Sequence, residues 1–263
     1  MKRAVSLMAT AVIVLHLAAC SSAPEEPAYA DESFMNALSQ GLMARWDEAD
    51  KPEPAGMDYY SSEYSEYLSN LIDIELASIA EYRNASFEDG KLQEAAISYI
   101  NVLEDSKEAA ELIPIDYEEY SSKWEKAYNE RSKAISSFVS EFGLTVDEAH
   151  QNILDDFIGT AQKVIADEEL QVKIDAMFDA LNFQFSETSY SYKTYTATLS
   201  NNTGATFDYI LLTIDLLDES GTILEQAYAS TDMLADGSSI ILEFTTDKNF
   251  TSYEIHPDYY IQE

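Results

Sequence analysis

The sequence contains a single cysteine, Cys20, among 263 residues. One thiol cannot form an internal disulfide, and it cannot supply the several cysteine ligands of a structural zinc site. Histidine is nearly as rare, with three residues in the whole chain. Because His150 and His256 have no second histidine or cysteine at ligand spacing, we expect no metal site and no cofactor.

Basic residues are also scarce, since 15 Lys and Arg stand against 49 Asp and Glu, a formal net charge of −34. Nucleic acids and anionic lipid surfaces require a cationic face on the protein that binds them. We therefore expect no nucleic-acid partner. We interpret the acidity as a means of staying solvated outside the cytoplasm rather than as a cation-binding site.

The common motifs of catalysis are missing as well. The chain has no Gly-x-Ser-x-Gly, no Ser-x-x-Lys and no glycine loop of the kind that holds phosphate. Adjacent acids such as Asp155-Asp156, Glu118-Glu119 and Glu104-Asp105 diverge by about 100° on a helix, so we expect them to face water. The acids before Gly221 and Gly237 lack the alternating ligands of a calcium loop and are interpreted as turns. We predict no catalytic residue.

A long apolar run occurs only at the start of the chain. Met1-Lys2-Arg3 is followed by a mostly apolar stretch from Ala4 to Ala18, and then by Cys20. This is the pattern of a signal peptide. The alternatives are an ordinary cleaved secretory signal with an incidental cysteine, or an uncleaved helix, although the run is shorter than the ~20 residues of a membrane span.

Leu17-Ala18-Ala19-Cys20 resembles the lipobox of bacterial lipoproteins, in which Leu and two small residues precede the cysteine. The resemblance implies that residues 1–19 are removed by cleavage between Ala19 and Cys20 and that Cys20 carries diacylglycerol. It also implies a place on the extracytoplasmic face of the bacterial cell membrane. Cleavage would remove Lys2 and Arg3, leaving 13 basic residues against 49 acids and a net charge of −36.

Residues 20–30 are interpreted as the lipidated cysteine and a flexible tether, because they are rich in Pro, Glu and small residues. From Asp31 the hydrophobic period becomes helical, as in Phe34, Leu38, Leu42 and Trp46. We predict an antiparallel helical bundle over residues 31–182. Its second helix runs from about Asp58 to Arg83. The later helices begin at a capping box at Ser86–Asp89, at Asp116, and at a capping box at Thr145–Glu148.

Two further expectations concern these helices. A single helix from Thr145 to Leu181 would be unusually long, so we expect a break at Asp167-Glu168-Glu169. The second and fourth stripes are rich in aromatic residues, and we interpret these residues as core rather than as an aromatic ligand cage. They are Tyr60, Tyr64 and Tyr67 in one stripe and Tyr117, Tyr120, Trp124 and Tyr128 in the other.

Near Asn182 the hydrophobic period changes from helical to alternating. Ile210, Leu212, Ile214 and Leu216 alternate with Tyr209, Leu211, Thr213 and Asp215, and glycine-containing turns separate such runs. We predict six or seven strands over residues 183–263, forming a small antiparallel Ig-like β-sandwich. The fold class is therefore α+β with two domains.

The run from Ser200 to Gly221 resembles the FxLYD-type extracellular β-sandwich domain. It has an Asn-Thr-Gly turn at 202–204, an aliphatic strand, and an Asp…Gly hairpin at 218–221. The resemblance implies fold and location but no activity. The helical part is similar to helical regions of uncharacterised Gram-positive lipoproteins. We predict a cell-surface lipoprotein that acts as a non-catalytic binding or scaffolding module, with a protein or glycan partner. The alternatives are a surface polysaccharide hydrolase with a carboxylate pair and, less favoured, a solute-binding lipoprotein.

Overall fold

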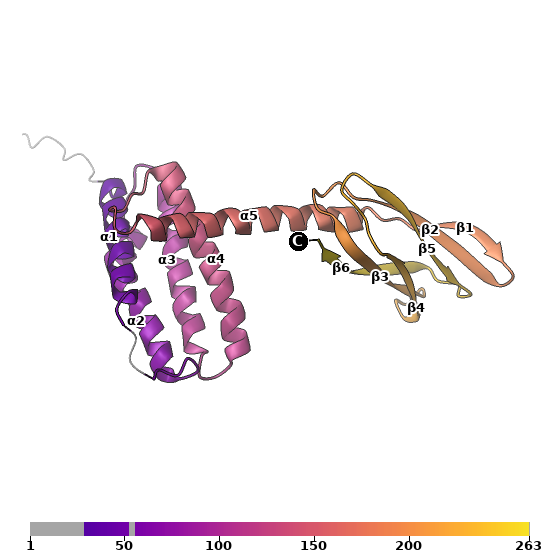
Figure 1. The fold of residues 1–263 in the computed structure, drawn as a ribbon, viewed down its shortest axis with the longest axis horizontal. Coiled ribbons are helices and arrows are strands. Elements are labelled where there is room, and N and C mark those ends of the chain that lie inside the picture. The colour runs from indigo at the N-terminus through magenta and orange to yellow at the C-terminus, as the bar shows by residue number, and fades with distance from the viewer. Residues whose placement is uncertain (1–28, 53–55, 263) are drawn as a thin grey trace, which may run out of the picture.

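The computed structural model describes residues 29–52 and 56–262, and within them five α-helices are followed by six β-strands. This is the predicted α+β layout of two domains (Figure 1). The helical elements are α1 (Asp31–Ala49), α2 (Ser62–Ile79), the 3-10 helix η1 (Ala80–Asn84), α3 (Gly90–Glu111), α4 (Tyr117–Phe142) and α5 (Gln151–Asp179).

Three of the helices begin at a polar side chain that accepts hydrogen bonds from the first turn. Ser61 Oγ accepts from the Tyr64 N–H at 3.2 Å before α2, and Asp116 Oδ1 accepts from the Glu119 N–H at 3.0 Å before α4. At α3 the acceptor is Asp89. The capping box predicted to begin at Ser86 is therefore wrong, because its last residue is the cap.

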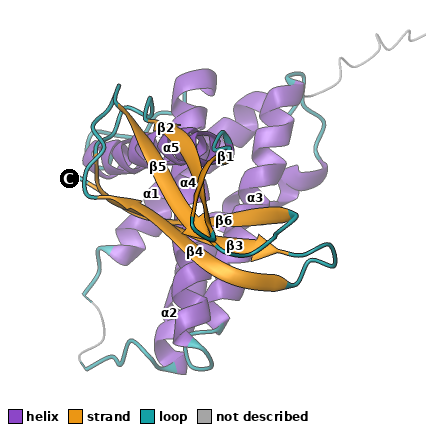
Figure 2. Cartoon of the chain, turned by 90° about the vertical axis from the view of Figure 1, so that its right-hand side faces the viewer, coloured by secondary structure: helices purple, strands orange, loops and turns teal. Residues whose placement is uncertain are grey.

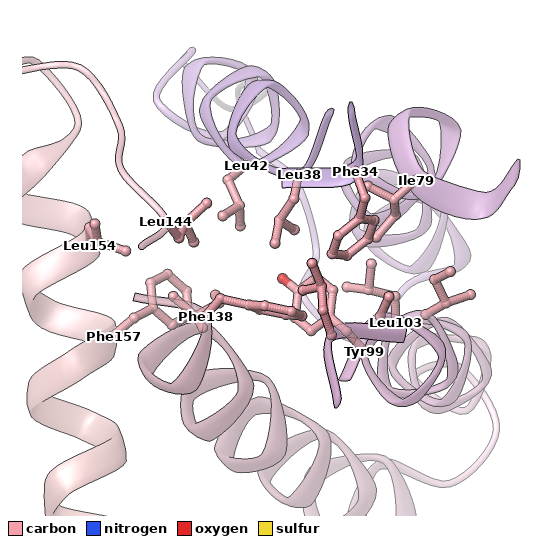
Figure 3. Close-up of a cluster of buried hydrophobic side chains, with 14 of the residues drawn as sticks. Phe34, Leu38, Leu42, Ile79, Tyr99, Leu103, Phe138, Leu144, Leu154 and Phe157 are labelled. Atoms are coloured by element: carbon pink, nitrogen blue, oxygen red, sulfur yellow. The ribbon is translucent and has the colours of Figure 1, made fainter. Parts of the chain in front are cut away.

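Helices α1 to α4 pack side by side around one hydrophobic core (Figure 3). Their stripes meet at side chains with almost no exposed surface, which include Phe34, Leu38, Tyr99 and Phe138. Leu154 and Phe157 at the start of α5 close one side of this core. The helical period therefore predicted the bundle and its inner face.

Helix α5 is continuous from Gln151 to Asp179, so the break expected at Asp167-Glu168-Glu169 is wrong. Its middle consists largely of good helix formers, and most of its side chains from 162 to 169 are exposed. Glu168 pairs with Lys133 of α4 at 2.8 Å. The helix crosses the bundle and then leaves it to reach the strands, so α5 is not a bundle helix along its whole length (Figure 1).

The start of α5 also differs from the prediction. The helix begins three residues after the expected capping box, and His150 is its N-terminal flanking residue. Asp147 Oδ1 accepts from the His150 N–H at 3.2 Å and pairs with His150 Nδ1 at 2.6 Å. Asp147, an inner residue of the expected box, thus orders the loop before the helix.

The strands form two three-stranded antiparallel sheets, with orders β1-β2-β5 and β4-β3-β6 (Figure 2). Alternate residues of each central strand point inward, as the period-two pattern predicted; on β3 these include Ile210, Leu212 and Ile214. The strands are β1 (Gln184–Ser189), β2 (Tyr192–Ser200), β3 (Phe207–Leu217), β4 (Ile223–Thr231), β5 (Ser239–Thr246) and β6 (Ser252–Ile261).

The core between the sheets also receives side chains from the end of α5. Ile174, Met177, Phe178 and Leu181 are buried in the same cluster as the inward residues of the strands. The domain boundary between residues 182 and 183 stays a prediction, and it places these four side chains on the helical side.

Candidate functional site

An aromatic cluster lies at one end of the helical bundle. Its members come from the loop before α2, the first turns of α2, the turn before α4, and the first turns of α4. We call it the tyrosine surface, and it consists of Tyr59, Tyr60, Tyr64, Tyr67, Ile115, Tyr117, Tyr120 and Trp124. In Figure 1 the starts of α2 and α4 lie at the end of the bundle opposite the start of α1. Since α3 spans 22 residues, the two ends are roughly 30–35 Å apart.

The local sequence brings the two aromatic segments together. Residues 112–116 form a tight turn around Pro114, which cannot continue α3, and Asp116 then begins α4. Ser61 begins α2 on the neighbouring side of the bundle. Each N-terminal cap is therefore flanked by tyrosines, so the two helix starts place Tyr60 and Tyr117 against each other.

Ring contacts join the aromatic residues into two chains, and both chains pack on the same apolar cluster. The Tyr60 and Tyr117 ring centroids are 4.5 Å apart and tilted by 50°. Tyr117 contacts Tyr120 at 5.3 Å, and Tyr120 contacts Trp124 at 5.8 Å. On the α2 side, Tyr64 contacts Tyr59 at 5.0 Å and Tyr67 at 6.1 Å. Below the rings lies a small apolar cluster that contains Leu68, Leu71, Ala110, Ile113 and Tyr120.

The prediction that the aromatic stripes are core holds for Tyr64, Tyr67, Tyr120 and Trp124, which lie in or against the apolar cluster. It is wrong for Tyr60, Tyr117 and Tyr128, whose rings face solvent. Tyr60 is 62% exposed, Tyr117 43% and Ile115 78%. Tyr120 is buried beneath them, and burial raises its pKa to about 12, with the neighbouring Tyr64 and Tyr117 adding to the shift. The tyrosine surface is thus an exposed aromatic layer on a buried aromatic base.

Acidic residues dominate the segments that build this surface. Residues 57–68 and 111–124 contain seven acids and one basic residue, a balance of −6. All seven acids are exposed; they are Asp58, Glu63, Glu66, Glu111, Asp116, Glu118 and Glu119. The basic residue, Lys123, pairs with Glu119 at 2.7 Å.

A second notable cluster is buried in the bundle around Glu75, whose side chain has no exposed surface. Its carboxylate accepts from Arg45 Nη1 at 2.8 Å, from Arg131 Nη2 at 2.9 Å, and from the Tyr99 hydroxyl. Burial alone would raise the pKa of Glu75, but the two guanidinium groups and the hydroxyl hold it below its usual value. Arg131 also lies over the Phe157 ring at 4.6 Å. The cluster fixes helices α1 to α4 in one arrangement.

The prediction that the adjacent acids face water is confirmed. The pairs Asp155-Asp156, Glu118-Glu119 and Glu104-Asp105 are exposed. His150 lies just before α5, and its Nε2 contacts Asp47 Oδ1 of α1 at 3.1 Å. On the sheet β4-β3-β6, the buried Asp215 accepts from Gln226 at 2.8 Å and contacts His256 at 3.2 Å.

The two glycine turns considered for calcium use their acids internally. Asp218 Oδ1 accepts from the Ser220 and Thr222 N–H groups at 2.8 and 3.0 Å, and Asp236 Oδ1 accepts from the Gly204 N–H at 2.9 Å. Across residues 29–52 and 56–262, no group of three His, Cys, Asp or Glu side chains is placed to hold a metal ion.

The residues predicted for lipidation and cleavage, Leu17, Ala18, Ala19 and Cys20, lie outside the described residues. Within the described part of the chain, no helix has the length and apolar character needed to cross a membrane.

No model of a known protein family matches the chain, and a comparison with curated proteins finds none similar to it. The resemblances to bacterial lipoproteins and to the FxLYD-type domain therefore depend on the quoted residues alone.

Proposed function

We propose that the protein is a bacterial lipoprotein, anchored through diacylglycerol on Cys20 to the extracytoplasmic face of the membrane, which binds a partner through the tyrosine surface. The anchor is supported by the match of Leu17 to Cys20 to a lipobox. The FxLYD-type identity of the β-sandwich is part of the same proposal. The function is binding or scaffolding rather than catalysis.

The exposure of the tyrosine surface is the observation that carries the binding function. Isolated exposed apolar residues are normal, whereas contiguous aromatic surface in contact with water is typical of interaction sites. Tyrosine and tryptophan are enriched in the residues that dominate binding energy, because they offer a large apolar area with few rotatable bonds. Here the exposed Tyr60 and Tyr117 contact each other, and Tyr117 contacts the buried Tyr120, so both rings are held in place before a partner arrives.

The position of this surface fits an anchored protein. The chain reaches α1 at the end of the bundle opposite the tyrosine surface (Figure 1). A tether that ends at Ala30 would therefore hold the near end of the bundle toward the membrane and leave the tyrosine surface accessible from outside.

Mass spectrometry of the membrane-extracted protein tests the anchor. The account predicts a mature chain that begins at Cys20 and carries lipid mass, and Cys20→Ala should lose that mass. Two acyl chains hold a protein far more firmly than the marginal ~10⁴ M⁻¹ of one. An unmodified Cys20 thiol, or a chain that still begins at Met1, would refute the anchor.

Sedimentation with isolated cell envelopes tests the binding site. The mature protein, in a nonionic detergent, is mixed with envelopes of the producing cell that lack it. Tyr60→Ser/Tyr117→Ser should sediment much less than the wild type, and the matched control Tyr190→Ser/Tyr192→Ser should not differ. The control tyrosines are also exposed, but they lie in the β1–β2 hairpin. Equal sedimentation of all three proteins would contradict the proposal.

The hydrolase alternative has no observation that favours it. A carboxylate pair must converge on one substrate, whereas the buried acids of the described residues, Glu75 and Asp215, lie in separate cores. Each already accepts hydrogen bonds from neighbouring side chains.

A further inference from the structure

We propose that the tyrosine surface binds a cationic segment of another protein, rich in lysine or arginine. The inference rests on the proposed function and names the class of partner for the same site. It combines two properties of the surface that are independent of each other, the exposure of its rings and the sign of its charge.

The charge around the rings is of one sign. The seven acids of residues 57–68 and 111–124 come from both sides of the ring cluster, and all are exposed. The single lysine among them is already paired with Glu119. A polyanionic partner such as nucleic acid would be repelled at this surface. A neutral glycan can donate hydrogen bonds to the carboxylates, but it has no charge for them to attract. A cationic segment would be attracted and oriented by them.

The rings offer a second interaction to the same groups. Lysine ammonium and arginine guanidinium groups are attracted to the face of an aromatic ring when they lie within about 6 Å of its centroid. Tyr60 and Tyr117 are tilted by 50°, so they do not cover each other's faces as parallel rings would. Both are exposed. The aliphatic stems of lysine and arginine can lie on exposed Ile115 while their charges reach the acids.

Two other exposed tyrosines of the chain, Tyr190 and Tyr192, have different surroundings. Tyr190 is fully exposed and Tyr192 is about half exposed in the β1–β2 hairpin. Residues 184–195 of that hairpin contain one acid, Glu187, and one basic residue, Lys193. The hairpin therefore offers tyrosines without a negative surrounding, and it separates the effect of exposed rings from that of rings among acids.

Fluorescence anisotropy with a labelled ten-residue oligolysine tests the inference. The probe is titrated with the full mature protein in nonionic detergent, and every variant is first checked for a wild-type thermal unfolding curve. Tyr60→Ser/Tyr117→Ser should weaken binding by about tenfold or more, as removal of central aromatic residues does at interfaces. Glu63→Gln/Glu118→Gln should weaken it several-fold and reduce its salt dependence. Tyr190→Ser/Tyr192→Ser should stay within about twofold of the wild type.

Oligolysine can also be attracted by the overall charge of −36, and the control variants identify that result. If Tyr60→Ser/Tyr117→Ser binds the probe as the wild type does, attraction is general and the inference is wrong. The envelope assay then separates the two proposals. If sedimentation requires Tyr60 and Tyr117 but is insensitive to salt and to excess oligolysine, the cationic partner is refuted and the binding function stands. If sedimentation does not require these tyrosines, the binding function itself fails.

Discussion

Glu75→Gln should destabilise the helical bundle by about 3–5 kcal/mol, the range found when one partner of a buried ion pair is removed. Glu75 is fully buried and accepts hydrogen bonds from Arg45, Arg131 and Tyr99. Glutamine keeps the shape of the side chain but removes its charge, so the buried guanidinium of Arg131 and that of Arg45 at the edge of the core lose their counterion. The loss of two hydrogen bonds to charged groups, at roughly 1.5–3 kcal/mol each, gives a similar figure.

Denaturant unfolding followed by tryptophan fluorescence measures this loss in the bundle alone. Trp46 and Trp124 are the two tryptophans of the chain, and they lie in α1 and α4. The measurement belongs near pH 7. Because the pKa of folded Glu75 is lowered from 4.5, its contribution to stability is complete above that unfolded value and is lost as pH falls through the folded value.

A compensated variant distinguishes unpaired charge from lost packing. Glu75→Leu/Tyr99→Phe/Arg131→Met removes the buried polar groups together and leaves Arg45, whose side chain is partly exposed and can turn toward water. This variant should be more stable than Glu75→Gln, since apolar replacement of a whole buried ion cluster is often neutral. If Glu75→Gln costs less than about 1 kcal/mol, the cluster behaves like a surface salt bridge and the reasoning is refuted.

Three more results are expected. Asp147 raises the pKa of His150 above 6.5, with Asp47 adding to the shift. This stabilisation is complete below the unfolded value of 6.5 and is lost as pH rises through the higher folded value, so the bundle unfolding midpoint should fall as pH rises above 6.5. An equal fall in His150→Gln would contradict this. Glu168→Pro should destabilise α5 by about 3 kcal/mol and change the small-angle scattering profile of the protein, whereas Glu168→Ala should leave that profile unchanged. Identical profiles for Glu168→Pro and the wild type would refute a rigid α5. A fragment of residues 167–263 should unfold cooperatively when followed by circular dichroism. A fragment of residues 183–263 should not, because it lacks four core side chains whose burial contributes ~1.5–3 kcal/mol each. Cooperative unfolding of residues 183–263 would instead place the domain boundary at residue 182.

The sequence predicted the layers of the fold better than the ends of its elements. Stripes such as Phe34, Leu38 and Leu42 identified the inner faces because burial follows period. Helix starts were less accurate where several acids competed, as at Ser86–Asp89, since the cap depends on which carboxylate the preceding loop directs at the helix. The expected break in α5 was wrong because its end is held by a second core that the local sequence does not reveal.

The tyrosine surface was recognised as aromatic stripes but assigned to the core. The hydrophobic period alone does not tell where a neighbouring helix ends. Tyr60 precedes α2 and Tyr117 is the first residue of α4, so their rings are exposed, whereas Tyr120 is covered by neighbouring residues of α2 and α3. The Glu75 cluster was missed, although a signal exists. Glu75 falls on the stripe of Leu68, Ile72 and Ile79, and Arg131 falls on that of Ile135 and Phe138. Opposite charges on the inner stripes of two helices indicate a buried pair.

Photo-crosslinking on intact cells shows whether the tyrosine surface binds a cationic partner protein, because the protein is then anchored and its partner is present. A photoreactive phenylalanine derivative replaces Tyr60 in one variant and Tyr190 in another, and both are illuminated on the cells that produce the protein. The account predicts a discrete crosslinked protein from position 60 and not from position 190, and loss of that product when oligolysine is added. No crosslink at position 60, or the same products from both positions, would contradict it.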